Sequence, residues 1–280
     1  MRGTKGGVRG PRRGEGEESR MSDLVRSEKD GVVTLTLNRP ERRNALSRAL
    51  GHELLGALRE LAQDESARVL VLTGAGKAYC AGGDFSEIQA ANADPLKAEE
   101  GVGVFLDVFR ALREIPFPSV ARINGDAVGG GCCLALGCDL RIAVRGARFG
   151  LPFVNIGLAG ADLGASYILP RLVGLTRATE MLLLGQTVTA EEAVGFGMIH
   201  RCVEPDALDQ EVGDLVGRLA RGPRLALRLT KQALAASLDR GLEEALAFER
   251  YAQTLAIQSP DVLEGVKAFL EKRPPRFGAG

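Results

Sequence analysis

The sequence is poor in the residues that many catalytic and metal sites use. Its 280 residues include no tryptophan and only two histidines, His52 and His200, and aromatic residues make up 5%. Two histidines are too few for a multi-histidine metal site, and any Ser/His/Asp triad would have to use one of them. Lys and Arg number 36, and Asp and Glu also number 36, so no net charge attracts nucleic acid or an anionic membrane.

Long apolar runs and an apolar secretion signal are also lacking. No window approaches the roughly 20 apolar residues of a membrane span. The five cysteines are an odd number, which favours reduced thiols over a disulfide framework. Cys132, Cys133 and Cys138 lack the paired CxxC spacing and the nearby histidine of a zinc site. We therefore expect a soluble, cytoplasmic protein without a metal site and without nucleic acid or membrane partners.

The first 20 residues differ in composition from the rest of the chain. They hold six basic, three acidic and six glycine residues, with Val8 as the only large aliphatic residue besides Met1. Such a segment buries too little apolar surface to offset its ordering entropy, so we predict a disordered leader over residues 1–20. Met21 is an alternative translation start. The remainder has 30 basic and 33 acidic residues and is slightly acidic.

Hydrophobic periodicity predicts strands and helices that alternate along the first part of the chain. The expected strands are 33–37, 68–73 and 119–123, and the expected helices are 47–62 and 98–113. This order requires crossover connections and predicts a mainly parallel sheet covered by helices. Helical patterns dominate later, at 206–220, 224–237, 241–256 and 261–272. We expect an α/β core over residues 21–205 and a helical oligomerisation region over 206–280.

Two glycine-rich turns follow predicted strands. One reads G-A-G-K-A-Y-C-A-G-G-D from Gly74 to Asp84, and the other reads N-G-D-A-V-G-G-G-C from Asn124 to Cys132. Glycine lets a ligand approach main-chain N–H groups, and two such turns can direct these donors at one oxyanion. Either turn alone would be an ordinary tight turn, and neither forms a P-loop or a GxGxxG motif.

These turns are accompanied by N-R-P-E-R-R-N-A-L at 38–46, L-P-R-L-V-G at 169–174 and G-V-K-A-F-L-E-K-R-P-P-R-F at 265–277. From Val25 to the C-terminus the chain resembles the enoyl-CoA hydratase/isomerase, or crotonase, superfamily. The resemblance implies an α/β fold with a crotonase-like superhelix of ββα repeats and a helical C-terminal trimerisation region. It also implies a homotrimer or homohexamer that binds an acyl-CoA thioester, with coenzyme A as part of the substrate rather than a separate cofactor.

The resemblance assigns roles to individual residues. It implies that the backbone N–H groups of Ala81 and Gly130 form an oxyanion hole. The substrate and CoA path would include Arg43, Ala45, Ala81, Gly82, Gly83, Asp84, Gly130, Phe153 and Lys272. Arg42, Arg43, Lys77 and Lys272 are expected to contact CoA phosphates, with Lys272 contributed by a neighbouring subunit; otherwise they are solvated charges.

The chain departs from the hydratase pattern at both catalytic glutamates. The matching positions are Cys133 and Phe153. Asp162, eight residues before Pro170, resembles the catalytic aspartate of the superfamily's dienoyl-CoA and epoxyphenylacetyl-CoA isomerases, although the loop after Gly157 is one residue longer. We therefore expect Asp162 to be the acid/base of a double-bond isomerisation or hydration. The alternative is that Asp162 only caps the following helix.

Other interpretations stay open. A thioester hydrolase would use Asp162 or Cys133, and a non-catalytic member would bind acyl-CoA without turnover. Glu87 is a secondary acid/base candidate, or else a solvated side chain on a helix. We expect the aromatic side chains to shape the acyl pocket; these are Phe85, Phe105, Phe153 and Tyr167.

Overall fold

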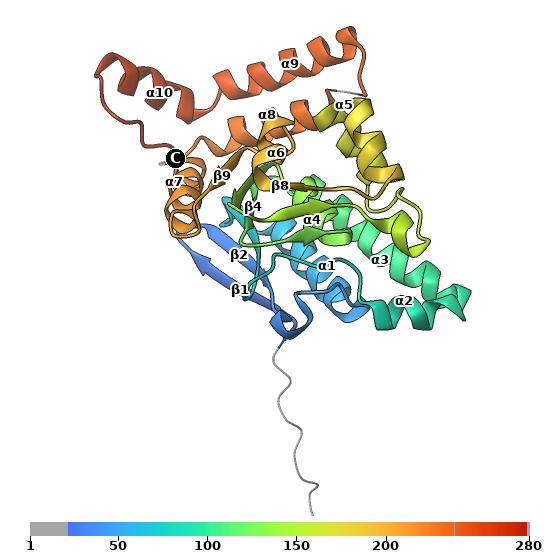
Figure 1. Cartoon of the computed structure of the whole chain (residues 1–280). Coiled ribbons are helices and arrows are strands. Elements are labelled where there is room, and N and C mark those ends of the chain that lie inside the picture. The colour runs from blue at the N-terminus through green and yellow to red at the C-terminus, as the bar shows by residue number, and fades with distance from the viewer. Residues whose placement is uncertain (1–21, 238, 279–280) are drawn as a thin grey trace, which may run out of the picture.

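A computed structural model describes residues 22–237 and 239–278 of the chain. The predicted leader over residues 1–20 lies outside the described residues. The described part contains a six-stranded sheet, a smaller three-stranded sheet and helices that surround them (Figure 1). The α/β architecture with C-terminal helices agrees with the sequence-based expectation.

The main sheet carries the turns of interest. Its strand order is β1 (Leu24–Lys29), β2 (Val32–Leu37), β3 (Val69–Gly74), β4 (Ser119–Ile123), β6 (Leu140–Val144) and β9 (Arg201–Val203). Neighbours from β2 to β9 pair in parallel, and only β1 pairs antiparallel, as the alternation of strands and helices predicted. Since Thr73 pairs with Arg122, β3 and β4 end at the same edge of the sheet. Both glycine-rich turns therefore leave from that edge.

The second sheet continues the turn after β4. It joins β5 (Ala127–Val128), β7 (Arg148–Gly150) and β8 (Thr187–Thr189), with β7 between the other two. Strands of two or three residues have no measurable periodicity, and tertiary pairing holds them in place. The sequence analysis accordingly did not predict β8 or β9.

The helices of the first half cover the main sheet. They are α1 (Arg48–Gln63), α2 (Phe85–Asn92), α3 (Pro95–Glu114) and α4 (Gly130–Gly137), together with short 3₁₀ helices η1 (Pro40–Arg42) and η2 (Phe153–Ile156). Ser47 caps α1 by accepting the Leu50 N–H. One face of this helix is buried and carries Leu50, Leu54, Leu55, Leu58 and Leu61. All eight residues of α4 are buried, so α4 lies in the core directly behind the second glycine-rich turn.

The C-terminal half is mostly helical. It contains α5 (Ala165–Leu183), α6 (Ala190–Gly195), α7 (Leu208–Ala220), α8 (Arg224–Ala236), α9 (Leu242–Ile257) and α10 (Pro260–Leu270). The helical path of α5 is interrupted at Gly174, which has φ 77° and ψ 159°. The last helix begins at Pro260, one residue before its expected start, with Ser259 as the N-cap residue. Within residues 22–237 and 239–278, no helix combines the length and the apolar content that a bilayer crossing requires.

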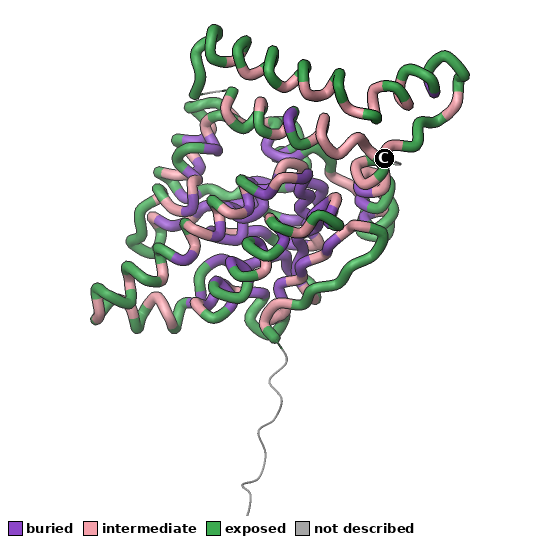
Figure 2. Tube along the Cα trace, turned by 180° about the vertical axis from the view of Figure 1, so that it is seen from behind, coloured by how far each residue is buried: buried purple, intermediate pink, exposed green. Residues whose placement is uncertain are grey.

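The last two helices bury little, since α9 has no buried residue and α10 has only Ala268. Figure 1 shows α9 and α10 beyond α8, on the side away from β1 and β2. Seen from behind, their trace is largely exposed or intermediate, whereas buried residues concentrate in the body (Figure 2). The pair exposes large apolar side chains, including Leu242, Ile257, Leu263, Phe269 and Leu270.

Candidate active site

The two glycine-rich turns pack main chain against main chain. A Cβ atom at Gly82 would lie 2.9 Å from the Val128 carbonyl oxygen and 3.5 Å from the Gly130 nitrogen. The N–H of Val128 donates to the Cys80 carbonyl at 2.9 Å. The structure therefore brings the two predicted turns together, and only a residue without a side chain fits at Gly82.

Each proposed oxyanion donor has a defined backbone position. Gly130 is the first residue of α4, so its N–H is one of those without an acceptor inside the helix. Gly129, with φ 54°, directs the chain into this helix. The N–H of Ala81 donates to the carbonyl of Arg43 at 3.0 Å. The Ala81 N–H is therefore already paired with main chain, and its role as an oxyanion donor stays a prediction. Gly130 lies where its N–H has no acceptor inside the helix.

Asp162 lies beside the first turn of α4. The Cys133 thiol contacts the Asp162 carbonyl, with 3.7 Å between sulfur and oxygen. The Asp162 carboxylate accepts the N–H of Leu163 at 2.9 Å, and Leu163 has the rare φ of 40°. Burial raises the pKa of Asp162, because desolvation penalises the carboxylate more than the Leu163 hydrogen bond stabilises it. Strained backbone next to a perturbed carboxyl group is characteristic of functional loops.

The helix-cap interpretation of Asp162 is wrong. The N-cap residue of α5 is Gly164, in the left-handed conformation with φ 72°, and no side chain caps that helix. The carboxylate instead accepts the N–H of the next residue, Leu163. The Asp162 main-chain oxygen accepts the N–H of Ala165, the first residue of α5. Helix capping therefore does not explain an aspartate at this position.

A family model described as enoyl-CoA hydratase/isomerase matches residues 27–280. The chain belongs to this family. It is an enzyme of the enoyl-CoA hydratase/isomerase, or crotonase, superfamily that acts on acyl-CoA, as its relatives below also indicate.

Characterised relatives cover nearly the whole of this family member. It is 40% identical over 252 residues to the 1,2-epoxyphenylacetyl-CoA isomerase of Escherichia coli, which covers 88% of this chain and 95% of that protein. The 2,3-dehydroadipyl-CoA hydratase of the same organism is 38% identical over 262 residues, covering 92% and 99%. An enoyl-CoA hydratase structure from Mycobacterium smegmatis superimposes with a TM-score of 0.85 at 40% identity, covering 91% and 98%.

In this crotonase, the two positions that lack the hydratase glutamates are apolar. Cys133 is fully buried, and its pKa is raised well above the usual thiol value by desolvation. A neutral buried thiol is a poor nucleophile, which argues against the hydrolase mechanism through Cys133. Phe153 is also buried, and its ring lies 3.7 Å from where a Cβ at Gly129 would be. Asp162 touches α4 through its main-chain carbonyl, and its carboxylate is near enough to Cys133 to raise the pKa of that thiol further.

Two other predicted acidic residues have structural partners. The Asp84 carboxylate caps α2 through Ser86 and pairs with Arg39 at 3.0 Å. Glu87 accepts the N–H of Arg48, the first residue of α1, at 2.8 Å. The Glu87 carboxylate therefore fixes α1 to α2, which corrects its interpretation as a freely solvated side chain and leaves it little freedom as an acid/base. A cap from another helix has no signature in local sequence.

The residues expected to contact CoA do not all lie near the two glycine-rich turns. Arg43 adjoins them through its carbonyl, while its side chain, like those of Arg42 and Lys77, is exposed. Ala45 is half-buried in the same segment. Lys272 follows α10, on the helix pair that stands beyond α8. Its contact with CoA stays a prediction that requires a neighbouring subunit.

Of the four aromatic residues expected at the pocket, Phe153 lies at the turns. Phe105 packs on α1 at Gly51, and Phe85 is 70% exposed. Tyr167 donates its hydroxyl to Asp239, and Arg171 stacks on its ring with 3.7 Å to the centroid. A place in the acyl pocket therefore stays a prediction for Phe85, Phe105 and Tyr167, and Tyr167 also joins α5 to the α8–α9 connection.

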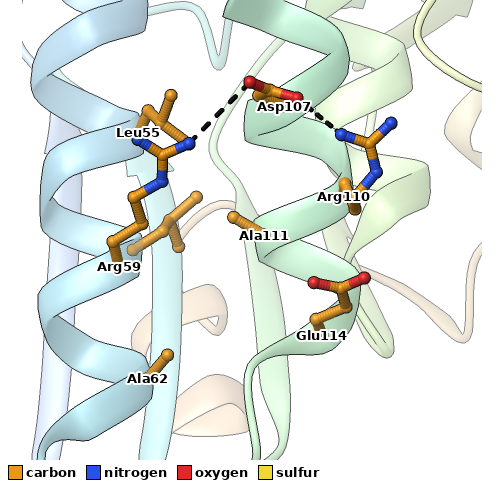
Figure 3. Close-up of a pocket in the computed structure, with 8 residues that line it drawn as sticks. Leu55, Arg59, Ala62, Asp107, Arg110, Ala111 and Glu114 are labelled. Carbon is orange, nitrogen blue, oxygen red and sulfur yellow. Dashed lines mark hydrogen bonds and ion pairs between the residues drawn. The ribbon is translucent and has the colours of Figure 1, made fainter.

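A separate surface cavity of about 160 Å³ lies between α1 and α3. Figure 3 shows Arg59 and Arg110 on either side of Asp107, and the ion-pair distances are 3.8 Å and 2.5 Å. The cavity is lined by none of the predicted site residues, and its two arginines are balanced in charge by Asp107 and Glu114. It does not belong to the acyl-CoA site.

Proposed function

We propose that this enzyme shifts a double bond in an unsaturated acyl-CoA, with Asp162 as the single acid/base. The observation that carries the proposal is the half-buried Asp162 carboxyl group beside α4, whose pKa is raised by desolvation. A carboxyl group poised nearer neutrality can both take and return a proton. One relative at 40% identity is named an isomerase of an epoxidised acyl-CoA, which supports isomerisation of an acyl-CoA as the reaction type.

The reaction needs one base and hydrogen-bond donors that stabilise the negative charge of the intermediate. Asp162 removes an α or γ proton, and the electron pair of that C–H bond moves into a dienolate with its charge on the thioester oxygen. The N–H groups of Ala81 and Gly130 stabilise this oxygen, where one such donor contributes roughly 2.7–4 kcal/mol to lowering a barrier. Protonated Asp162 then returns the proton to the other carbon, so no group is consumed.

Hydration is the second candidate, because a relative at 38% identity is a hydratase. Asp162 would then hold and activate a water molecule in place of the paired glutamates of other family hydratases. Hydrolysis through Asp162 and binding without turnover are the remaining alternatives.

One assay separates these reactions. The protein is incubated with 2-enoyl-, 3-enoyl- and dienoyl-CoA in D₂O, and product mass, deuterium content and free thiol are followed. Isomerisation keeps the substrate mass apart from exchanged deuterium, hydration adds a water, and hydrolysis releases thiol. Asp162→Asn should abolish turnover, whereas Asp206→Asn, which changes an exposed carboxylate, should not. Full activity in Asp162→Asn would refute the mechanism, and CoA binding without turnover in the unaltered protein would establish a binding module.

We also propose that α9 and α10 form a subunit interface in a homotrimer or homohexamer. The support is the row of apolar side chains that these helices expose, among them Phe269 at 83% and Leu263 at 75%. Contiguous apolar surface of this kind marks association sites. Such an interface would also bring Lys272 to a neighbouring subunit.

A further inference from the structure

A second surface cavity, of about 470 Å³, lies at the edge of the main sheet where β3 begins. Its walls come from four separate segments, which are the β1–β2 turn, the segment before β3, the end of α7 and the chain after α10. The first glycine-rich turn leaves the opposite end of β3, six residues along, which is about 20 Å at 3.3 Å per residue. The cavity is therefore separate from the candidate active site.

Three arginine side chains from three of these segments line the cavity, and we call it the arginine cavity. They are Arg68, Arg221 and Arg276. Asp30 is the acidic residue among the lining residues, so three positive charges face one negative charge and the net charge is +2. Within residues 22–237 and 239–278, none of the three arginines forms an ion pair. Like charges that share a cavity without enough counter-charge repel one another, and a bound anion would remove this repulsion.

Arg68 has a fixed position in the arginine cavity. Its Nη2 donates to the carbonyl of Gly222 at 2.6 Å. Its side chain also lies between two glycines, because its Cγ is 2.6 Å from where a Cβ atom would be at Gly31 and its Nη1 is 3.6 Å from where one would be at Gly278. The remaining N–H groups of this guanidinium have no acceptor among the described residues, so they are available to an anion.

The chain after α10 carries Arg276 and is fixed to α10 itself. The Glu264 carboxylate accepts two N–H groups of Arg273, at 2.7 and 2.9 Å, and the main-chain N–H of Arg276 at 2.7 Å. The hydrogen bonds from Arg273 lower the pKa of Glu264 to about 2, so this carboxylate stays ionised near neutral pH. Figure 1 shows the segment returning from α10 to the side of α7. In the part of the chain that the structure describes, no hydrogen bond or ion pair joins residues 274–278 to the fold before α9.

We propose that the arginine cavity binds a small ligand with a diphosphate group. The two phosphates would bridge Arg276 to Arg68 and Arg221, since a guanidinium group presents its N–H donors in the geometry that phosphate oxygens accept. The negative charge of a diphosphate offsets the net charge of +2, and the volume lies within the range of small-molecule sites. The half-buried ring of Phe277 lines the same cavity, so a nucleoside diphosphate fits it better than pyrophosphate alone. A bound ligand would thus join the segment after α10 to the body of the fold.

The test measures the binding of pyrophosphate and of ADP to the full chain by isothermal titration calorimetry. Arg221→Gln and Arg276→Gln each remove one positive charge of the cavity and keep a polar side chain. Arg228→Gln is the matched control, because Arg228 is also an exposed arginine but lies on α8, outside the cavity. Both probes are titrated at low and at high salt concentration.

We expect both probes to bind the unaltered protein and Arg228→Gln with the same Kd, and ADP to bind more tightly than pyrophosphate. Each cavity substitution should raise the Kd of either probe about tenfold, the loss expected for one charge-assisted hydrogen bond. High salt should weaken the binding, since the contacts are partly exposed. Without a ligand, Arg276→Gln should keep or raise Tm, because it reduces the repulsion in the cavity, whereas replacing a purely structural arginine would lower Tm.

A second readout locates the site. Phenylglyoxal modifies arginine, and bound ADP should protect Arg221 and Arg276, but not Arg228, from modification as followed by mass spectrometry. No binding of either probe would overturn the proposal. Binding with an unchanged Kd in both cavity variants would overturn it too, because the probes would then occupy another site, such as the path predicted for CoA. Equal affinity for the two probes would support a site that recognises the diphosphate group alone.

Discussion

Alanine at position 82 places a methyl group between the two glycine-rich turns. Gly82 has φ 94°, outside the left-handed region that side chains tolerate, which costs about 1–3 kcal/mol. The methyl carbon would also lie 2.9 Å from the Val128 carbonyl oxygen, and overpacking of this kind costs about 1–3 kcal/mol. The expected loss of unfolding free energy is therefore about 2–6 kcal/mol, which lowers Tm by about 5–15 °C for a domain of this size.

The effect on catalysis should exceed the effect on stability. The same methyl carbon would lie 3.5 Å from the Gly130 nitrogen, in the space where a substrate oxygen approaches that donor. We expect kcat for Gly82→Ala to fall about 10²–10³-fold, as when one oxyanion donor is removed. Turnover of enoyl-CoA substrates at 15 °C, below the expected unfolding range, is the assay, with circular dichroism to confirm folding.

Gly146→Ala is the matched control for backbone strain. Gly146 also has a positive φ, 80°, but a Cβ atom there would have no neighbour within 4 Å. It should lose only the backbone contribution to stability and keep its kcat. If folded Gly82→Ala has the kcat of Gly146→Ala, the substrate oxygen does not lie between the turns, and the assignment of the oxyanion hole is refuted.

Three further predictions concern charge and assembly. Because the proposed mechanism needs the Asp162 carboxylate, kcat/KM should rise with pH through a pKa above the usual aspartate value. The raised pKa also implies that Asp162→Asn gains unfolding free energy near neutral pH and that this gain disappears at acidic pH. A pH-independent difference in denaturant titrations would contradict this. Lys231→Met should destabilise the fold by about 1–3 kcal/mol in urea unfolding, because half-buried Asp139 loses the cation 2.8 Å away and keeps only its hydrogen bonds from Ser119. A change below about 0.5 kcal/mol would show that Ser119 alone satisfies the carboxylate. Replacing Leu263 and Phe269 by Glu should convert the assembly to monomers in analytical ultracentrifugation, and unchanged sedimentation would exclude α10 as the interface.

Elements with strong periodicity could be predicted closely. The strand expected at 119–123 is β4, and the helix expected at 224–237 ends one residue earlier as α8. The short strands β8 and β9 could not be predicted, since three residues carry no period and their positions depend on pairing with β7 and β6. Local pattern determines the long elements, and tertiary contacts determine the short ones.

The candidate active site also combines features that local sequence predicts with features that only tertiary contacts determine. The two turns could be found because glycine clusters after buried strands are visible in sequence. The partners of the acidic residues could not, since Glu87 meets a main-chain N–H 39 positions away and Asp162 bonds to its own neighbour through a positive φ at Leu163. The buried hydrogen bonds of Asn44 could not be predicted either, although the residue lies in the N-R-P-E-R-R-N-A-L run. Its main-chain partners depend on how the chain folds back.

The proposed oxyanion donors at Ala81 and Gly130 are peptide groups, so no substitution other than one to proline removes the N–H itself. Point mutations at this site change instead what surrounds the donors, as at Cys133 and Phe153, where this chain lacks both hydratase carboxylates. A lineage can thus exchange one proton-transfer chemistry for another while the charge-stabilising device is inherited intact. The main-chain cradle makes this fold a scaffold on which new reactions can arise by few mutational steps.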